Sequence, residues 1–111
     1  MAKENFNEKV YPLLRKVPKG KVTTYKILAE ALGTKAYRAV GQAMKCNPYA
    51  PEVPCHRVVL SNGKVGGFMG SSNSNSNEVK RKILLLKKDG INVKNGKILD
   101  FEKKLCRFSL P

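Results

Sequence analysis

Residues 24–45, TYKILAEALGTKAYRAVGQAMK, decide the expected fold of this chain of 111 residues. Thr24 can cap a first helix over residues 25–32, because its hydroxyl can accept a hydrogen bond from a free backbone N–H of the first turn. Thr34 can cap a second helix over residues 35–45 in the same way, and the sequence CNP that follows should end it. Two short helices joined by about two residues are typical of a helix-turn-helix, and equally of any other helical hairpin.

Two more helices are expected, one on each side of this unit. Apolar residues recur at helical spacing over residues 4–17, and Pro12 inside that stretch should kink the helix or shift its start. Ser76 or Asn77 can cap a later helix that ends at Lys88.

Two tight hairpins and a polar loop complete the expected fold. Residues 58–60 and 64–65 flank a Ser-Asn-Gly turn, and residues 91–99 alternate around an Asn-Gly pair, which favours a hairpin. Residues 71–77, SSNSNSN, indicate a flexible surface loop. The expected fold class is mainly α, a winged-helix-like/helix-turn-helix domain with short β-hairpins, formed by residues 1–111 as a single domain.

The composition points to a nucleic-acid partner. Twenty-two Lys and Arg against eight Asp and Glu give a formal net charge of +14, and a small domain this basic usually binds a polyanion. The charge alone also fits high solubility or nonspecific binding. No apolar run approaches the roughly 20 residues that span a bilayer, and the N-terminus has no apolar signal-peptide segment. We therefore expect a monomer that is cytoplasmic, or nuclear or nucleoid-associated, that is not secreted and that has no membrane partner.

The cysteines indicate free thiols. Cys46, Cys55 and Cys106 are an odd number without paired spacing, which is typical of cytosolic thiols and not of a disulfide framework. A single histidine and the lack of a CxxC pair argue against a structural zinc site. No metal and no other cofactor is expected.

The sequence PCHR, residues 54–57, places a thiol beside the only imidazole of the chain. Cysteine attacks as its thiolate, and a neighbouring imidazole, directly or through water, can take its proton. Adjacent residues on a strand point to opposite faces, so Cys55 and His56 need a turn or a bridging water to cooperate. For an isolated Cys-His pair, a buried thiol with a chance histidine neighbour is the more frequent explanation.

The wider sequence resembles a known family. PCHRVV is similar to the active-site motif of the O6-alkylguanine-DNA alkyltransferases. GKVTTYKILAEALG, AYRAVGQAM, NP and VGGF follow that family's order at nearly its spacing. The resemblance extends from residue 6 to about residue 93, and the blocks together are specific where PCHR alone is only suggestive.

The resemblance implies a set of catalytic residues. Cys55 is expected to be the alkyl acceptor and His56 the base that deprotonates it through a water. Asn47 is expected to order the thiol and the water. The family usually anchors the histidine with a glutamate before a glycine, and here Asp89 stands at that position, one methylene shorter. Either the backbone lies closer, or a water intervenes, or the base is weaker.

The resemblance also implies how the chain meets its substrate, which is double-stranded DNA carrying alkylated bases. Tyr25 is expected to hydrogen-bond the extruded guanine, and Arg38 to fill the gap left in the base stack. The expected substrate-binding residues are Tyr25, Val58, Phe68 and Met69. The expected DNA-binding residues are Lys26, Thr34, Arg38, Ala39, Gly41, Gln42 and Ser61. Small residues on the second helix would permit close approach to the minor groove.

The activity implied is direct reversal of damage. The base is flipped out of the duplex, and the thiolate displaces guanine from the alkyl carbon in one step, with O4-alkylthymine as a related substrate. A thioether has no easy exit, so each molecule would react once. Two positions differ from the family's usual residues: Phe68 stands where a tyrosine is common, and Met69 where a small residue is common. These differences leave open which alkyl groups and bases are preferred. The family's N-terminal domain is expected to be absent.

Two other functions remain open. Alkyltransferase-like proteins flip the same lesions without repairing them and hand them to excision repair. They generally replace the reactive cysteine, often with tryptophan, whereas this chain has Cys55 and His56. A helix-turn-helix transcription regulator would explain the charge and the helices, but it leaves NP, PCHR and VGGF without a role.

Overall fold

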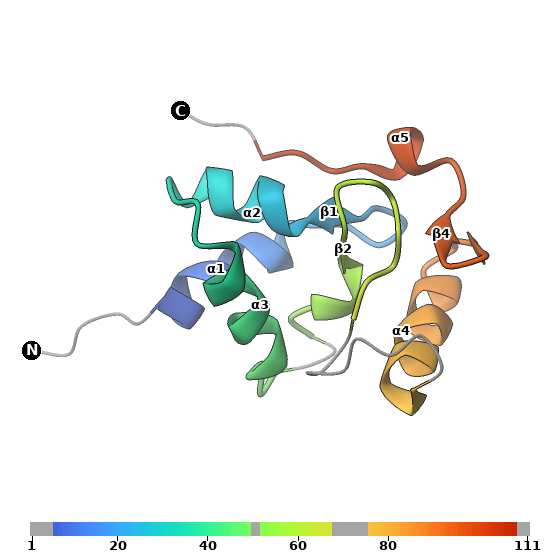
Figure 1. The fold of residues 1–111 in the computed structure, drawn as a ribbon, viewed down its shortest axis with the longest axis horizontal. Helices are drawn as coiled ribbons and strands as arrows, with labels where there is room; N and C mark the ends of the chain where they lie inside the picture. Colours follow the sequence, from blue (N-terminus) through green and yellow to red (C-terminus); the bar gives the residue numbers. More distant parts are fainter. Residues whose placement is uncertain (1–5, 50–51, 68–75, 109–111) are drawn as a thin grey trace, which may run out of the picture.

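The computed structural model describes residues 6–49, 52–67 and 76–108, and within them the chain is rich in helices, with two small sheets (Figure 1). The helices are α1 (Phe6–Arg15), α2 (Tyr25–Ala31), α3 (Tyr37–Lys45), α4 (Asn77–Lys88) and α5 (Phe101–Lys104), with a 3₁₀ turn, η1 (Cys55–Arg57). The strands are β1 (Thr23–Thr24), β2 (Val58–Val59), β3 (Val93–Lys94) and β4 (Lys97–Ile98). Within the described ranges, no helix is long and apolar enough to cross a membrane.

The two helices predicted from residues 24–45 are present, but the second begins later than expected. Thr24 caps α2 as predicted, since its Oγ1 accepts a hydrogen bond from the Ile27 N–H at 3.0 Å. Thr34 does not cap α3, which begins at Tyr37 after Ala36. The Thr34 N–H instead bonds the carbonyl of Ala29 at 2.9 Å and so closes the end of α2. Its hydroxyl accepts from the Ala36 N–H at 3.1 Å, and the connection is therefore longer than the two residues predicted.

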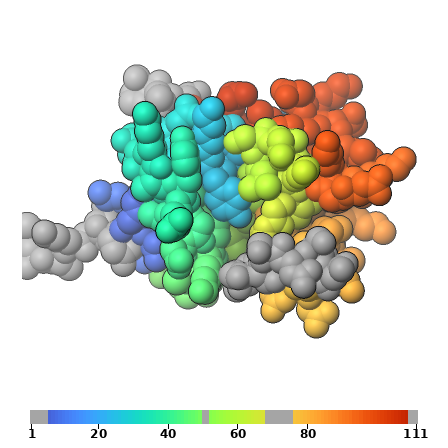
Figure 2. Space-filling view, viewed as in Figure 1, coloured from blue at the N-terminus to red at the C-terminus, as the bar shows by residue number. Residues whose placement is uncertain are grey.

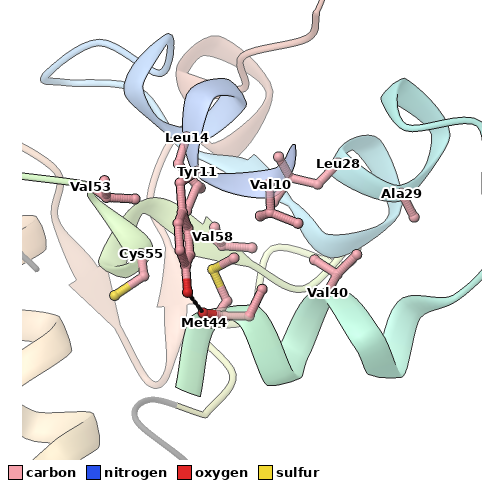
Figure 3. Packing of buried hydrophobic residues seen from close by; sticks show 11 residues of the cluster. Val10, Tyr11, Leu14, Leu28, Ala29, Val40, Met44, Val53, Cys55 and Val58 are labelled. Carbon is pink, nitrogen blue, oxygen red and sulfur yellow. Dashed lines mark hydrogen bonds between the residues drawn. The ribbon is translucent and has the colours of Figure 1, made fainter. Parts of the chain in front are cut away.

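The first hydrophobic cluster joins α1, α2 and α3 (Figure 3). Apolar side chains at helical spacing face inward from each helix, as the helical pattern predicts. Tyr11 of α1 packs among them and donates from its hydroxyl to the carbonyl of Ala43 in α3 at 3.1 Å. Pro12 lies inside α1 on its exposed side, and residues 4–5 of the predicted helix lie outside the described residues. Cys55 is at the margin of this cluster.

The strand pairing near Cys55 differs in part from the prediction. The tight turn after β2 forms, with the Gly63 N–H bonded to the Leu60 carbonyl at 2.9 Å. The Leu60 N–H also bonds the Lys64 carbonyl across this turn at 2.9 Å, as a tight hairpin requires, but β2 itself pairs in parallel with β1 in the register Thr23–Val58 and Thr24–Val59, which was not predicted. Val58 and Val59 are both fully buried, and a strand buried on both faces suits a parallel pair inside the molecule.

The second hydrophobic cluster joins α4 to the C-terminal hairpin. Ser76 caps α4 by accepting from the Val79 N–H at 3.2 Å, as predicted. The predicted Asn-Gly hairpin is confirmed: β3 and β4 pair antiparallel, and Asn95 and Gly96 both have positive φ, 51° and 77°, as this turn type requires. The part of the polar loop at residues 71–75 lies outside the described residues.

The C-terminal segment runs back along the molecule from α5, past the start of β1 (Figure 1). Val22, just before β1, donates to the carbonyl of Lys104 at 2.9 Å, and its own carbonyl accepts from the Cys106 N–H at 2.6 Å. The segment after α5 thus lies beside β1 and leads Phe108 to the first cluster.

Candidate functional site

The loop before Cys55 is fixed by Asn47. This side chain is buried, and its Nδ2 donates to the carbonyl of Val53 at 2.8 Å while its Oδ1 accepts from the Tyr49 N–H at 2.9 Å. One amide therefore ties the end of α3 to both sides of the proline-rich loop. Because buried amides rarely go unpaired, these two bonds specify the path of the chain into Cys55.

Cys55 is only 2% exposed, and this burial dominates its chemistry. Burial raises the pKa of the Cys55 thiol, although the Asn47 side chain and the positive charge of Lys82 act in the opposite direction. A thiol with a raised pKa is protonated at neutral pH and is a weak nucleophile. Reaction at Cys55 therefore needs a base.

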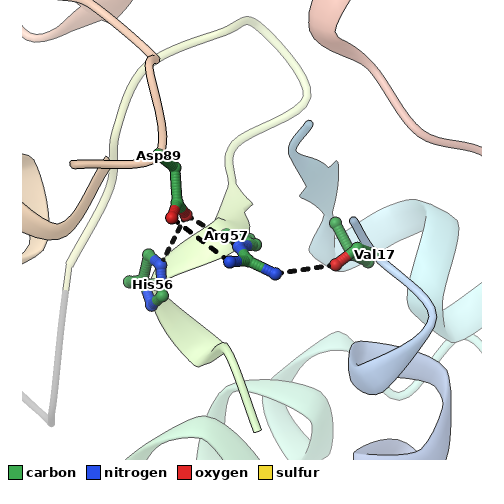
Figure 4. A network of polar contacts seen from close by, with 4 residues as sticks. All are labelled: Val17, His56, Arg57 and Asp89. Carbon is green, nitrogen blue, oxygen red and sulfur yellow. Dashed lines mark hydrogen bonds and ion pairs between the residues drawn. The ribbon is translucent and has the colours of Figure 1, made fainter. Parts of the chain in front are cut away.

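His56 lies next to that thiol on the 3₁₀ turn η1. With three residues per turn, successive side chains of such a turn are about 120° apart, in contrast to the opposite faces of a strand. This meets the requirement for a turn at residues 55 and 56. His56 is 4% exposed, and its Nε2 lies 2.8 Å from Oδ2 of Asp89 (Figure 4).

The carboxylate of Asp89 fixes the tautomer of His56. Burial raises the pKa of Asp89, but hydrogen bonds from Arg57 and His56 outweigh it, and the net pKa is lowered. Asp89 is thus an acceptor near pH 7, so Nε2 of His56 carries the hydrogen and Nδ1 carries the lone pair. Burial lowers the pKa of His56 although Asp89 raises it, and the imidazole is therefore a neutral base.

The shorter aspartate reaches its partner directly. Asp89 is the C-cap that follows α4, and the 2.8 Å contact with His56 leaves no room for a water between them. The direct contact excludes the intervening water that was one of the alternatives expected from the sequence.

Arg57 completes this cluster and was missed by the analysis of the sequence. Its Nε donates to Oδ2 of Asp89 at 2.7 Å, its Nη2 to Oδ1 at 3.2 Å, and its Nη1 to the carbonyl of Val17 at 2.8 Å (Figure 4). The available signal was its position within PCHR, directly after the base.

Lys82 is a second buried cation close to the site. It is fully buried in α4, and its Nζ donates to the carbonyls of Val58, Val65 and Gly67 at 2.6, 2.7 and 3.0 Å. Burial lowers the pKa of Lys82 to about 7. Residues 79, 82 and 86 share one helical face, so the apolar stripe of α4 could have revealed that this lysine points inward.

Tyr25 borders a small cavity between α2, α3 and the segment near residue 60. The cavity has a volume of about 290 Å³, and its walls are formed by Tyr25, Lys26, Tyr37, Leu60 and Ser61. Burial, helped by Cys55, raises the pKa of Tyr25 to about 12, so its hydroxyl keeps its hydrogen and can donate. Val58 is fully buried in the first cluster. Phe68 and Met69 lie outside the described residues.

The outer face of α3 carries most of the residues expected to meet DNA. Val40, Ala43 and Met44 turn inward, which leaves Arg38 and Gln42 exposed. The small residues Ala39 and Gly41 are half-buried, as is Thr34, while Lys26 and Ser61 are exposed. Figure 2 shows α3, α2 and the segment near residue 60 reaching one face of the molecule. The lining of the small cavity likewise brings these three segments together.

Within residues 6–49, 52–67 and 76–108, no group of three or more His, Cys, Asp or Glu side chains is arranged to hold a metal ion. The chemistry that these residues can perform themselves is nucleophilic attack by a thiol whose proton passes to an imidazole backed by a carboxylate.

The helices α2 and α3 therefore belong to the same hydrophobic cluster as a buried thiol that is next to an imidazole and its carboxylate partner. The family model of the 6-O-methylguanine DNA methyltransferase, DNA binding domain, matches residues 5–91. The chain belongs to this family.

Relatives and solved structures agree with that assignment. A methylated-DNA–protein-cysteine methyltransferase of Metallosphaera sedula is 49% identical over 82 residues, which are 74% of this chain and 48% of that protein. One of Saccharolobus islandicus is 41% identical over 98 residues, 82% of this chain and 59% of that protein. The chain thus spans about half the length of these curated relatives.

Two solved structures of related proteins are similar to this chain. The O6-methylguanine-DNA methyltransferase of Pyrococcus kodakaraensis has a TM-score of 0.65 at 43% identity, over 78% of this chain and 47% of that one. Schizosaccharomyces pombe Atl1, solved in complex with damaged DNA containing O6-carboxymethylguanine, has a TM-score of 0.77 at 30% identity, over 96% of this chain and 99% of that one.

Proposed function

We propose that this chain repairs alkylated DNA by direct reversal, transferring the alkyl group of O6-alkylguanine to Cys55. One observation carries the proposal: the raised pKa of a buried thiol would leave it inert, yet the neighbouring residue is a neutral imidazole held by a carboxylate. A structural cysteine has no need of this arrangement. The fold expected for the whole unit is winged-helix-like, with the β3–β4 hairpin as the wing.

The proposed reaction is a single displacement. Nδ1 of His56 takes the proton of the Cys55 thiol, through a water. The thiolate forms a bond to the alkyl carbon while the bond from that carbon to O6 breaks, and the electron pair leaves with guanine. The hydroxyl of Tyr25, which keeps its hydrogen because its pKa is about 12, donates a hydrogen bond to the departing base. The thioether is stable, so each molecule reacts once.

The target base must leave the duplex before it can reach a buried thiol. The exposed Arg38 on α3 is suited to fill the gap in the stack, and the small residues Ala39 and Gly41 allow the helix to approach the minor groove closely. Gly41 also has open space around it, since a Cβ built there would meet nothing within 4 Å. Double-stranded DNA with alkylated bases is therefore the proposed partner.

A second function is favoured by one comparison. The likeness to S. pombe Atl1 covers nearly the whole of both chains, and a lesion sensor of that kind would bind the flipped base and recruit excision repair without transfer. The buried Cys55 with its His56–Asp89 pair favours transfer.

Intact-mass spectrometry after incubation with an oligonucleotide containing O6-methylguanine separates the two functions. Transfer predicts one added methyl group per protein, located in the peptide that contains Cys55. Cys55→Ser should abolish the gain, and Cys46→Ser, which changes an exposed thiol, should keep it. Tight binding to the modified duplex without any gain in mass would establish the sensor and refute the proposed reaction.

A further inference from the structure

We propose that Arg57 is a positioning residue that aims the Asp89 carboxylate at His56 and, by sharing that carboxylate, keeps the imidazole neutral. The effect on His56 is a property of the folded protein, and only its consequence for the rate of transfer rests on the proposed function. Neither the family resemblance nor the comparisons assign a role to this arginine.

The geometry of the arginine is that of a clamp. Its fork meets both oxygens of Asp89, at 2.7 and 3.2 Å, and its remaining amino group meets the Val17 carbonyl at 2.8 Å. Val17 is fully buried after α1, and Asp89 ends α4. The guanidinium is therefore held at both ends by elements far apart in sequence, and the planar fork leaves the carboxylate one orientation.

Asp89 needs such a clamp because of its position. It lies at the C-terminal end of α4, where the helix dipole and free carbonyl groups disfavour a negative charge. Its side chain is 9% exposed, so water compensates this charge only in part. Arg57 supplies the missing positive charge and turns the carboxylate towards His56.

The sharing of one oxygen decides the charge of His56. Oδ2 of Asp89 accepts from Nε2 of His56 at 2.8 Å and from Nε of Arg57 at 2.7 Å. A buried carboxylate whose only partner was the imidazole would favour the imidazolium, and an imidazolium cannot take the proton of Cys55. The charged groups that face His56 are Asp89 and Lys82 from α4 and Arg57 from its own turn, and the two cations both disfavour its protonation.

His56 is the only histidine in the chain, so its signals in a ¹³C- and ¹⁵N-detected NMR titration need no assignment. The wild-type protein should show the Nε2–H tautomer and a pKa below the ordinary 6.5. Arg57→Gln should raise that pKa by about one pH unit, because it removes a nearby positive charge and leaves Asp89 to His56 alone. Arg57→Lys keeps the charge but not the fork, and should raise it less.

The matched control is Arg15→Gln, which removes the same charge from an exposed pair with Glu52 at 3.6 Å and should leave the His56 pKa unchanged. A folded Arg57→Gln protein whose His56 titrates as in the wild type would overturn the proposal. If that variant does not fold, an Arg57→Lys protein with an unshifted pKa overturns it equally.

Rates of alkyl transfer give the second readout. In Arg57→Gln, the acid limb of the curve of transfer rate against pH should move to higher pH, by the same amount as the pKa of His56 rises. A shifted pKa in a protein that transfers no alkyl group at any pH would support the role of Arg57 while rejecting the proposed function. In an active protein, a shifted pKa of His56 with an unchanged acid limb of the rate would mean that His56 is not the base. Arg57 would then set the charge of His56 without affecting alkyl transfer.

Discussion

Asp89 shows how one methylene can be absorbed by the backbone. The carboxylate reaches Nε2 of His56 at 2.8 Å because α4 ends at this residue, and the Asp89 N–H still bonds the carbonyl of Leu86 at 3.0 Å. The terminal turn therefore holds the side chain close to η1. In physical terms, the placement sacrifices a little helix stability, since a negative charge at this end is unfavourable, for an oriented base.

We expect Asp89→Asn to slow transfer by at least about tenfold, because it removes the charge that orients and supports the base. Asp89 raises the pKa of His56, so its loss should move the acid limb of the rate profile further below 6.5 while lowering the plateau. Single-turnover rates between pH 5 and pH 9 test both effects, with Asp89→Glu as the active control. A wild-type profile in Asp89→Asn would mean that the base is supported by another group.

The free energy of unfolding should depend on pH through the carboxylate of Asp89. The folded-state pKa of Asp89 is below its ordinary 3.8, so its contribution is fully present above about pH 4 and is lost as the pH falls through the folded value. The difference in free energy of unfolding between the wild type and Asp89→Asn should therefore shrink in acid.

Helix α4 packs on the second hydrophobic cluster and also holds neighbouring backbone segments in place through Lys82. Lys82 reaches from its buried face to carbonyl groups of β2 and of residues 65–67. Those bonds hold the strand after the nucleophile, and the segment that leads towards Phe68, to one helix. A charge in this position is costly to bury, and it is tolerated because each N–H of the ammonium has an acceptor.

Lys82→Met keeps the length of the side chain and removes these hydrogen bonds. We expect the free energy of unfolding to fall by about 3 kcal/mol, because three buried carbonyls lose a donor. Urea denaturation followed by circular dichroism measures the change. Lys80→Met, on the exposed side of the same helix, should change stability by less than about 0.5 kcal/mol. Equal midpoints for the two variants would show that the Lys82 bonds contribute nothing net.

The sequence was most informative where a structure depends on near neighbours. The caps by Thr24 and Ser76 and the turn at Asn95–Gly96 follow from the stereochemistry of single residues, and all three are confirmed. The tight turn expected between residues 60 and 64 forms, but the pairing of Val58 and Val59 with a strand more than thirty residues earlier was not predicted. No local pattern encodes that partner, nor the contact of Arg57 with Asp89.

Over the whole molecule, the charge of +14 must be carried on the surface. Among the described residues, Lys82 is the fully buried cation, and Arg57 is partly covered. The other described lysines and arginines are mostly exposed. A surface of this kind attracts any polyanion, so sequence-independent contacts to phosphate should supply much of the affinity for DNA.

Binding to an undamaged duplex should weaken by at least roughly 100-fold when the salt concentration rises from about 50 to about 200 mM, because bound cations are released from the phosphates. Fluorescence anisotropy with a labelled duplex measures this. Arg38→Ala should lower the slope of log K against log salt by about one at most, with Arg15→Gln as a control of equal charge. An affinity that does not change with salt would assign binding to contacts other than phosphate.

The parallel pairing of β1 with β2 also sets the order in which the protein can be completed. The pair closes a loop that contains both α2 and α3. Val22, beside this pair, can form its backbone hydrogen bonds to Lys104 and Cys106 only after those residues have been made. Contacts so distant along the chain form late. During synthesis from the N-terminus, Cys55 emerges well before Asp89 and the closing segment. A growing polypeptide therefore exposes Cys55 and His56 before Asp89 has been made, and under the proposed function the base gains its supporting carboxylate only after α4 is complete.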